Sequence, residues 1–288
     1  MSRPIVILTD SGSDITPQEL RDHQVKLVPM SLTFEGKESF LDDQSIPMAG
    51  LWARMEAGEI LRTSQPSLQT FLDLFEEAKR KDLSVVYISL SSNISGTYQT
   101  ARAAVSMVDY DHIHVVDARQ AAATAAQKIL VYRACKLRDE GVLSAGEIAK
   151  DLEQFRFRIK HFSCLDTLEY LVRGGRLSKL AGNIGTLLSI KPIITFSKDG
   201  FVQVVKKVPG LKRATTELCN IVKEFPVDKA FPIIPIFAKD DTNCKNFLAH
   251  LKDTLGVTTE EAPMEIGATI GCHIGPGGFG LCYVQAES

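Results

Sequence analysis

The sequence predicts a two-domain α/β protein. An N-terminal domain with a doubly wound parallel sheet (residues 1–160) is followed by a C-terminal α+β domain with a mixed or antiparallel sheet (residues 161–288). Apolar strand-like runs alternate with helical segments up to about residue 160, which is the pattern of a doubly wound sheet. In the second half, Pro192 interrupts a strand and Asp199-Gly200 signals a hairpin, so antiparallel pairing is expected there. A chain of 288 residues is long enough for two such domains.

The N-terminal elements follow from apolar runs and helix-start signals. Residues 4–9 form a continuous apolar run, as expected of a parallel strand that helices cover on both faces. Pro17 opens a helix, and Ser144 and Glu147 have the spacing of a capping box. Further strands are expected at residues 25–30, 84–90 and 113–117, a hairpin at 34–40, and helices at 48–57, 68–81, 97–108, 120–140 and 144–155.

The C-terminal elements are shorter and follow a different order. Strands are expected at residues 161–164, 190–196, 202–205, 233–238, 265–270 and 281–284, and helices at 166–172, 211–225 and 243–255. Neither an internal repeat nor a low-complexity linker separates the two halves of the sequence. We therefore expect the two domains to pack against each other, with a ligand cleft between them.

The composition argues against several classes of function. The net charge is −2 and no basic cluster dominates the sequence, so no nucleic-acid partner is expected. No apolar stretch approaches the roughly 20 residues that span a bilayer, and no signal-peptide pattern precedes the first strand. The six cysteines are scattered without a C-x-x-C pair, so we expect reduced thiols in a cytoplasmic protein and no structural zinc.

Four stretches are rich in small polar residues and glycine: residues 10–14, 63–67, 91–97 and 271–280. The first three touch helix starts, and open α/β sheets bind ligands at the edge where strands lead into helices. At residues 91–97, free N–H groups of a helix start could hold a carboxylate or phosphate; simple turn and capping chemistry is the alternative. His273 stands among glycines, which allow close backbone approach to a ligand, although an ordinary satisfied histidine is the alternative.

Two of these stretches match other known sites only in part. Residues 10–14 lack the alternating carboxylates of a calcium loop, so turn chemistry is favoured and no metal site is predicted. Residues 275–280 match G-x-G-x-x-G, but no βαβ unit follows them, which argues against a dinucleotide cofactor.

Arg173 and Arg176 flank a Gly-Gly pair, and guanidinium groups fit carboxylates and phosphates. A cation opposing a helix dipole is the alternative, and it suits Arg173 better than Arg176.

In this order, the polar stretches resemble the DegV family of bacterial fatty-acid-binding proteins over nearly the whole chain. The matching segments are residues 7–14 (ILTDSGSD), 63–67 (TSQPS), 91–98 (SSNISGTY), 168–171 (LEYL) with 174–176 (GGR), and 271–273 (GCH) with the glycines that follow. Each segment is weak alone, whereas the set in this order and at this spacing is specific.

The resemblance implies that one long-chain fatty acid lies in an apolar tunnel between the two domains. It implies that the hydroxyls of Thr63 and Ser95 hold the carboxylate, with Arg173 and His273 in a supporting polar network; we add Ser11 and Arg176 to this network. It also implies a separate fatty acid kinase catalytic subunit that converts the bound acid to an acyl-phosphate for phospholipid synthesis. The chain itself would then be a lipid carrier, not an enzyme, with no catalytic residue, metal or cofactor besides the fatty acid.

Apolar side chains of the second half are candidates for the tunnel wall: Phe162, Leu165, Leu168, Leu187, Leu188, Ile190, Ile194 and Ile270. Residues 205–213 include four cations. This stretch could dock the kinase subunit or make transient contact with a membrane surface, and a solvated edge is an equal alternative.

Two other functions stay open at the level of the sequence. A serine hydrolase could use Ser95 with His273 and an acid such as Asp10 or Asp117, although Ser95 lacks the G-x-S-x-G elbow. A sensor or structural protein could bind lipid without presenting it to a kinase. Ester hydrolysis that is lost in Ser95→Ala would support the first, and failure of any kinase subunit to use the loaded protein would support the second.

Overall fold

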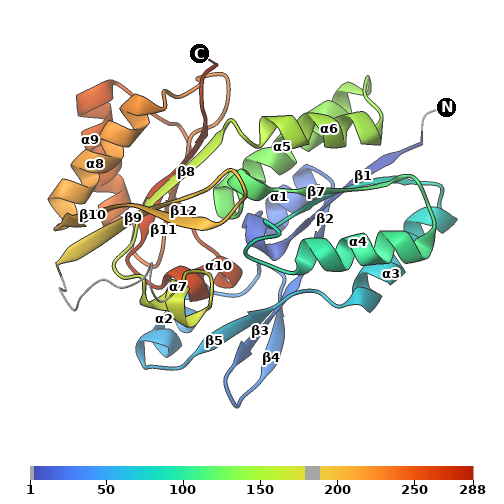
Figure 1. Ribbon diagram of the computed structural model, residues 1–288, viewed down its shortest axis with the longest axis horizontal. Helices are drawn as coiled ribbons and strands as arrows, with labels where there is room; N and C mark the ends of the chain where they lie inside the picture. The colour runs from blue at the N-terminus through green and yellow to red at the C-terminus, as the bar shows by residue number, and fades with distance from the viewer. Residues whose placement is uncertain (1–2, 179–188, 288) are drawn as a thin grey trace.

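The computed structural model describes residues 3–178 and 189–287. Figure 1 shows two lobes side by side, with the N-terminal half on the right and the C-terminal half on the left. Within these residues the strands form three sheets, in the orders β2-β1-β6-β7, β4-β3-β5 and β10-β9-β8-β13-β11-β12. A parallel N-terminal sheet beside a mixed C-terminal sheet confirms the predicted fold class.

The N-terminal sheet is parallel throughout. Its strands are β1 (Ile5–Asp10), β2 (Val25–Val28), β6 (Ser84–Ser89) and β7 (Ile113–Asp117). Every residue of β6 is buried, because helices cover both faces of the sheet. Phe71 and Phe75 of α3 (Leu68–Arg80) and Ala104 of α4 (Thr97–Val108) pack on one face. The sheet is therefore doubly wound, with α5 and α6 against its other face.

Local capping chemistry fixes the helix starts much as the sequence predicts. The short helix α1 (Pro17–Asp22) begins at its N-terminal proline. At α6 (Ala145–Phe155), Ser144 and Glu147 form the predicted capping box. At α3, the Ser67 hydroxyl accepts the N–H of Thr70 at 3.1 Å.

A small antiparallel sheet projects from the N-terminal lobe. It consists of β3 (Met30–Phe34), β4 (Ser39–Asp42) and β5 (Leu61–Ser64), with α2 (Met48–Glu56) between β4 and β5. The sequence predicts one strand over residues 25–30, and this prediction is wrong. The chain leaves the parallel sheet at Pro29, because proline has no N–H to give to a strand ladder.

The C-terminal sheet carries the antiparallel hairpin that Asp199-Gly200 predicts. Its strands are β8 (Ile159–Cys164), β9 (Ile190–Phe196), β10 (Val202–Pro209), β11 (Ile234–Phe237), β12 (Met264–Glu265) and β13 (Phe279–Val284). The pairs β9–β10 and β8–β13 are antiparallel, and β11–β12 is parallel. Helices α8 (Leu211–Glu224) and α9 (Thr242–Leu255) cover one face and form a core with Phe162 and Tyr283.

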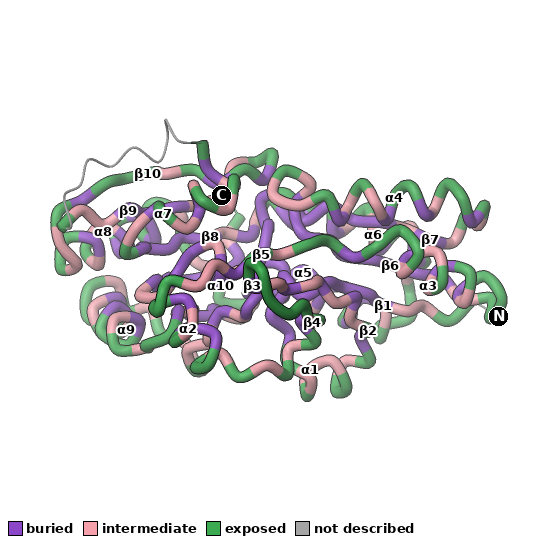
Figure 2. The backbone as a smooth tube through the Cα atoms, turned by 90° about the horizontal axis from the view of Figure 1, so that it is seen from below, coloured by how far each residue is buried: buried purple, intermediate pink, exposed green. Residues whose placement is uncertain are grey.

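Helix α5 (Thr124–Glu140) joins the two lobes. It contacts β1 and β6 of the N-terminal sheet and β8 and β13 of the C-terminal sheet. Its first eight residues are all buried, and Figure 2 shows it among the purple segments at the centre of the molecule. One continuous core runs from Ile7 to Ile236 and Cys282. Since β8 begins at Ile159, residue 160 stays our proposed boundary between the two domains.

Two predicted elements differ from the structure near the cleft. Instead of a strand at residues 265–270, the two-residue β12 is followed by the helix α10 (Ala268–Ile274). The Thr269 N–H and hydroxyl donate to Asp42 Oδ2 at 3.0 and 2.6 Å, so a carboxylate distant in sequence stabilises the first turn of α10. The helix predicted from residue 120 instead begins at Thr124, after a 3-10 turn at Arg119–Ala121.

Candidate functional site

An apolar cavity lies between the two lobes. Its wall is built mainly from aliphatic and aromatic side chains, among them Leu90, Leu171, Ile194, Phe196 and Ile270. Both lobes and the connecting helices contribute to it, which places it where the sequence predicts a ligand cleft. A cavity with this lining is typical of a site for a small apolar molecule.

Four of the predicted site residues line this cavity: Thr63, Ser95, Arg176 and His273. Thr63 comes from β5, and His273 from α10. The Thr63 hydroxyl and His273 Nε2 lie 2.9 Å apart. Ser95 precedes α4, and its hydroxyl lies 2.7 Å from the hydroxyl of Thr97. The structure therefore brings hydroxyls, an imidazole and a guanidinium from four segments to one cavity.

The imidazole of His273 is held neutral. Burial, aided by the nearby positive charge of Arg176, lowers the pKa of His273 to about 3. Its Nδ1 atom has no hydrogen-bond partner among the residues that the structure describes. Gly174 comes so close that a Cβ there would overlap this nitrogen. A glycine at position 174 thus allows the end of α7 (Glu169–Arg173) to pack against His273.

Arg176 is a part-buried cation whose partners in the described part of the chain are neutral. Its Nε donates to the Ile94 carbonyl at 3.0 Å, and one terminal nitrogen donates to the Gly174 carbonyl at 2.7 Å. Within residues 3–178 and 189–287, no carboxylate forms an ion pair with it. Burial lowers the pKa of Arg176, and a buried charge is costly unless an opposite charge compensates it. The cavity end is therefore suited to an anion.

Arg173 and Ser11 lie outside the cavity lining. Arg173 stacks over the Tyr170 ring at 4.7 Å and pairs weakly with Glu169 at 3.9 Å. It faces an outer depression that also involves Thr63, Arg176 and His273. Ser11 is fully buried; its hydroxyl donates to the Asp42 carbonyl at 2.6 Å and accepts the Met30 N–H at 2.9 Å. The geometry thus gives Ser11 a structural role beneath β3 and places Arg173 on the outer side.

Of the residues predicted to form the tunnel wall, some line the cavity and others do not. Leu165, Ile194 and Ile270 line the cavity. Phe162 does not, because side chains alternate along β8 and Phe162 packs towards α8 and α9. Leu168 is buried in the shared core, and neither it nor Ile190 is part of the cavity wall. Residues 187 and 188 lie outside the described residues.

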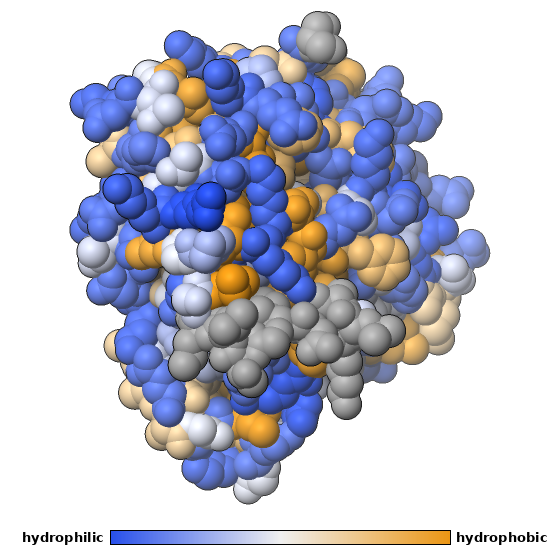
Figure 3. Space-filling view, turned by 60° about the vertical axis from the view of Figure 1, so that its left-hand side comes forward, coloured by the Kyte–Doolittle hydropathy of each residue, from blue (hydrophilic) through white to orange (hydrophobic). Residues whose placement is uncertain are grey.

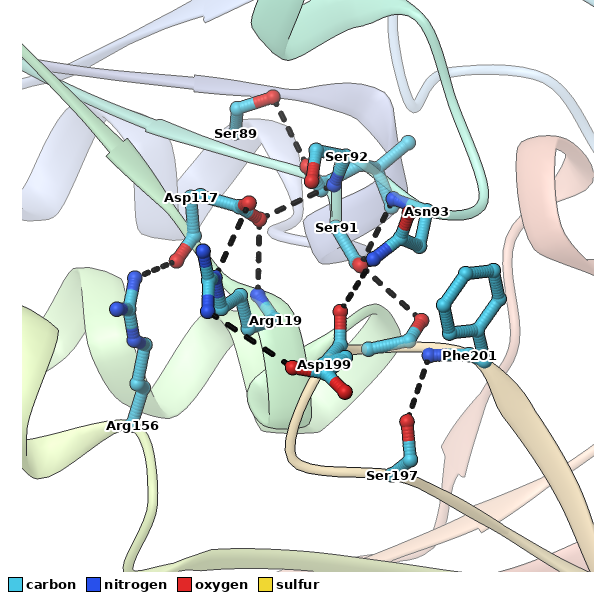
Figure 4. A network of polar contacts seen from close by, with 12 residues as sticks. Ser89, Ser91, Ser92, Asn93, Asp117, Arg119, Arg156, Ser197, Asp199 and Phe201 are labelled. Atoms are coloured by element: carbon cyan, nitrogen blue, oxygen red, sulfur yellow. Dashed lines mark hydrogen bonds and ion pairs between the residues drawn. The ribbon is translucent and has the colours of Figure 1, made fainter.

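The loop after β6 holds the tip of the β9–β10 hairpin (Figure 4). The Ser91 hydroxyl donates to the Gly200 carbonyl at 3.0 Å, and Asn93 Nδ2 donates to the Asp199 carbonyl at 2.7 Å. Arg119 Nε lies 3.6 Å from Asp117 Oδ2, and Arg119 Nη1 lies 4.0 Å from Asp199 Oδ1. Since Phe196 and Val202 at the base of this tip line the cavity, these contacts hold one part of its wall.

The predicted turn at residues 10–14 is confirmed. Asp10 accepts the Gly12 N–H at 3.1 Å, the Leu90 N–H at 2.9 Å and the Tyr87 hydroxyl at 3.0 Å. Burial nevertheless raises the pKa of Asp10 to about 6. Among the described residues, no group of three or more His, Cys, Asp or Glu side chains could hold a metal ion.

Four polar residues of the cavity wall escaped the sequence analysis: Thr124, His161, Ser163 and Thr269. His161 and Ser163 stand at alternate positions of β8, so both point to the cavity side of the sheet. The sequence held one signal for His161 and Ser163: two polar residues at alternate positions of a strand that is otherwise mostly buried.

Comparison with known proteins agrees with this geometry. The model of a family described as "Uncharacterised protein, DegV family" matches residues 4–286.

The chain belongs to the DegV family.

Its relatives include a DegV domain-containing protein of Caldanaerobacter subterraneus, 33% identical over 282 residues, with 98% of this chain and 99% of that protein aligned. A crystal structure of DegV, a fatty acid binding protein from Bacillus subtilis, is 28% identical and has a TM-score of 0.83, covering 99% of this chain and 100% of the other. A fatty-acid-binding DegV family protein from Thermus thermophilus gives 28% identity and a TM-score of 0.83 over 98% and 100% of the two chains. These structures confirm the DegV fold along the chain.

In the described part of the chain, no helix combines the length and the apolar character needed to cross a membrane.

Proposed function

We propose that this chain binds one long-chain fatty acid, with its carboxylate hydrogen-bonded by Thr63 and Ser95 and its acyl chain in the apolar cavity. The observation that carries the proposal is the part-buried guanidinium of Arg176, whose partners among the described residues are neutral carbonyl groups at the end of an apolar cavity. A carboxylate would compensate this charge, and an alkyl chain would fill the remaining space. Structural relatives from Bacillus subtilis and Thermus thermophilus are described as fatty acid binding, which supports the same ligand class here.

The two parts of such a ligand would contribute differently to binding. Burial of about fifteen methylenes at roughly 0.8 kcal/mol each gives about 12 kcal/mol before the costs of binding. A hydrogen bond to a charged group adds only about 1.5–3 kcal/mol. The acyl chain therefore supplies most of the affinity, whereas Thr63 and Ser95 fix the position of the carboxylate.

We further propose that the chain presents the bound acid to a separate kinase subunit. Thr63, Arg176 and His273 line both the cavity and the outer depression that carries Arg62 and Arg173. A carboxylate held at these residues would lie next to a cationic surface suited to a phosphoryl donor. One carboxylate oxygen would attack the terminal phosphorus of ATP bound by the kinase, giving an acyl-phosphate and ADP, and the acyl-phosphate would feed phospholipid synthesis in the cytoplasm.

The edge of the C-terminal sheet is our candidate for the docking surface. β10 lies at one edge of this sheet, and residues 205–213 run from it into the start of α8. Val205 is 42% exposed, and Lys206 pairs with Glu217. Figure 3 shows hydrophobic side chains gathered near the centre of an otherwise mostly hydrophilic face on this side of the molecule. The kinase subunit is the proposed partner, and transient contact with a membrane surface is the alternative.

The geometry does not favour a serine hydrolase. His273 Nε2 is engaged by Thr63, and the Ser95 hydroxyl by Thr97. Asp10 is bonded to backbone and side-chain groups around Gly12 and Leu90, and Asp117 to the Ser92 and Arg119 N–H groups. The nucleophile, base and acid of that hypothesis are therefore not connected in the described part of the chain.

Acyl-phosphate formation tests the presentation role. The protein, loaded with oleate or palmitate, is mixed with ATP and a fatty acid kinase catalytic subunit, and the product is trapped with hydroxylamine. We expect an acyl hydroxamate that requires both proteins. If the loaded protein yields none with any kinase subunit tried, although lipid stays bound, the sensor or structural role replaces the carrier role.

A further inference from the structure

The cavity wall contains a second polar group that the carboxylate site does not use. His161 and Ser163 project from β8, and Thr124 projects from the start of α5. Cys282 of β13 is the cross-strand partner of His161, and its thiol also interacts with the Thr124 hydroxyl. His161 and Thr124 therefore lie around the same cysteine, and we name His161, Ser163 and Thr124 the wall cluster.

The imidazole of His161 has one nitrogen with nothing to bind. Its Nε2 lies 2.8 Å from the Ser163 hydroxyl, whereas Nδ1 has no hydrogen-bond partner in the described residues. The residue is only 5% exposed, and burial lowers the pKa of His161 to about 4. The ring is thus neutral near pH 7, and Nδ1 is an unfilled donor or acceptor, depending on the tautomer.

Thr124 presents a second polar group with spare hydrogen-bonding capacity. The residue is fully buried, and its hydroxyl lacks a standard hydrogen bond to the rest of the described chain. The Cys282 thiol beside it is a weak hydrogen-bonding group. Thr124 also has a φ of 54°, a left-handed conformation that is unusual for a β-branched residue. Strained residues of this kind gather at ligand sites.

The chemistry of the wall cluster selects a neutral hydroxyl. A saturated alkyl chain would leave both polar groups buried and unpaired, which is costly. A second carboxylate would lack a counter-charge, because Arg176 belongs to the first site and no other Lys or Arg of the described chain lines the cavity. A hydroxyl can donate and accept at once, so it fits His161 in either tautomer as well as Thr124.

We propose that the preferred ligand is a long-chain fatty acid whose acyl chain carries a hydroxyl group, bound by His161 and Thr124. This inference rests on the proposed fatty-acid-binding function and specifies the class of acid. An unsubstituted acid would bind in the same cavity with these two groups unpaired or bridged by a buried water molecule.

Competition binding on the intact protein tests the inference. Delipidated protein is loaded with a fluorescent fatty acid, which is displaced by stearate and by a series of monohydroxystearates that differ in hydroxyl position. We expect at least one isomer to bind about tenfold more tightly than stearate, since a hydrogen bond to a buried, unpaired group is worth about that factor. The other isomers should bind no better than stearate, because their hydroxyls would meet apolar wall.

Substitutions in the wall cluster test whether it causes the preference for hydroxystearate over stearate. His161→Phe and Thr124→Val keep the approximate shape of each side chain and should each reduce the ratio of hydroxystearate to stearate affinity several-fold. Ile236→Val, a buried change in β11 that lies outside the cavity lining, is the control and should leave this ratio unchanged. Thermal unfolding of each variant confirms that it is folded.

The outcomes separate the two proposals. If stearate displaces the probe and no hydroxystearate binds better, the hydroxyl site is wrong and fatty acid binding stands. A preference that His161→Phe and Thr124→Val both leave intact also contradicts the wall cluster. If neither class of acid binds, the proposed function and this inference fail together.

Discussion

At the scale of residues, a substitution of Ser95 can test whether its hydroxyl positions the ligand or supplies binding affinity. Its hydroxyl accepts the Thr97 N–H at 3.3 Å and lies at the polar end of the cavity. We expect Ser95→Ala to reduce the rate of acyl-phosphate formation about tenfold or more, because a misplaced nucleophile loses its alignment with the phosphoryl donor. Lipid retention should fall less, since in the proposed complex the acyl chain would supply most of the affinity.

Hydroxamate trapping and mass spectrometry of retained lipid measure these two effects on one sample. Ser92→Ala is the matched control, because Ser92 uses its backbone N–H, not its hydroxyl, to bond Asp117 at 3.0 Å. Equal losses of lipid and of product in Ser95→Ala would count against the positioning role.

His161 predicts a pH dependence of stability. Its folded-state pKa of about 4 lies below the ordinary value, so the unfolded state binds a proton first as the pH falls. The stability that neutral His161 contributes is therefore present above about pH 6.5 and is lost as the pH falls towards 4. The advantage of the wild type over His161→Leu should fall by up to about 1.4 kcal/mol per pH unit in this window.

Denaturant unfolding of both proteins at pH 7, 6 and 5 checks this. Asp10, whose pKa burial raises to about 6, titrates in the same window in both proteins, so its effect cancels in the comparison. If the two stability curves run parallel, His161 is not the buried neutral histidine described above.

Sequence could predict some residues of the site and not others, for physical reasons. Thr63, Ser95, Arg176 and His273 stand in glycine- or hydroxyl-rich segments, which are visible locally. His161 stands in an apolar strand, and its unfilled nitrogen depends on its packing against Phe196 and Cys282. Ser11 shows the reverse case: it lies in a matching motif, but its hydroxyl is used by β3 and by Asp42.

At the scale of elements, the contact between α7 and α10 positions His273. A Cβ at Gly174 would overlap His273 Nδ1 and lie 3.1 Å from the Tyr170 carbonyl oxygen. We expect Gly174→Ala to displace the imidazole and to reduce acyl-phosphate formation at least several-fold, with a smaller effect on lipid retention.

Gly175→Ala is the control for this prediction. Gly175 has a φ of 74°, and among the described residues no atom beyond its chain neighbours lies within 4 Å of the position that a Cβ would take. Alanine there costs about 1 kcal/mol of stability without crowding His273. If the two variants lose activity equally, backbone strain explains the loss and the contact with His273 does not.

The β9–β10 hairpin tip depends on a few polar contacts with the N-terminal lobe (Figure 4). Asn93→Ala removes the 2.7 Å hydrogen bond to the Asp199 carbonyl, and a net loss of about 0.5–1.5 kcal/mol corresponds to a two- to tenfold change in local opening. Amide hydrogen exchange at residues 197–201 should accelerate by this factor.

Lys198→Ala is the comparison variant, since Lys198 is an exposed residue of the same turn. It should leave exchange at the tip unchanged. Identical exchange in the wild type and Asn93→Ala would show that the tip does not depend on this bond.

Among the elements, those specified by local chemistry were predictable. The capping box at Ser144 and the turn at Asp199-Gly200 act within a few residues. Helix α10 was not predictable, because Asp42 from a different sheet completes its first turn. The split at Pro29 was visible as a proline, but only the packing of β3 shows that the chain changes sheets there.

At the scale of the whole molecule, the cavity depends on both lobes at once. Helix α5 packs against both large sheets, and one core passes through them. The alternation of strands and helices could predict two sheets and a cleft. The volume and lining of the cavity could not be predicted, because they follow from how the lobes pack.

The central claim is that one fatty acid occupies this cavity, and its most direct test is extraction of the purified protein. The protein is denatured in organic solvent, and the extract is quantified by mass spectrometry. We predict one fatty acid per chain, of narrow chain length. An empty extract from protein that also fails to take up added oleate or palmitate would contradict the account, leaving the fold without this function.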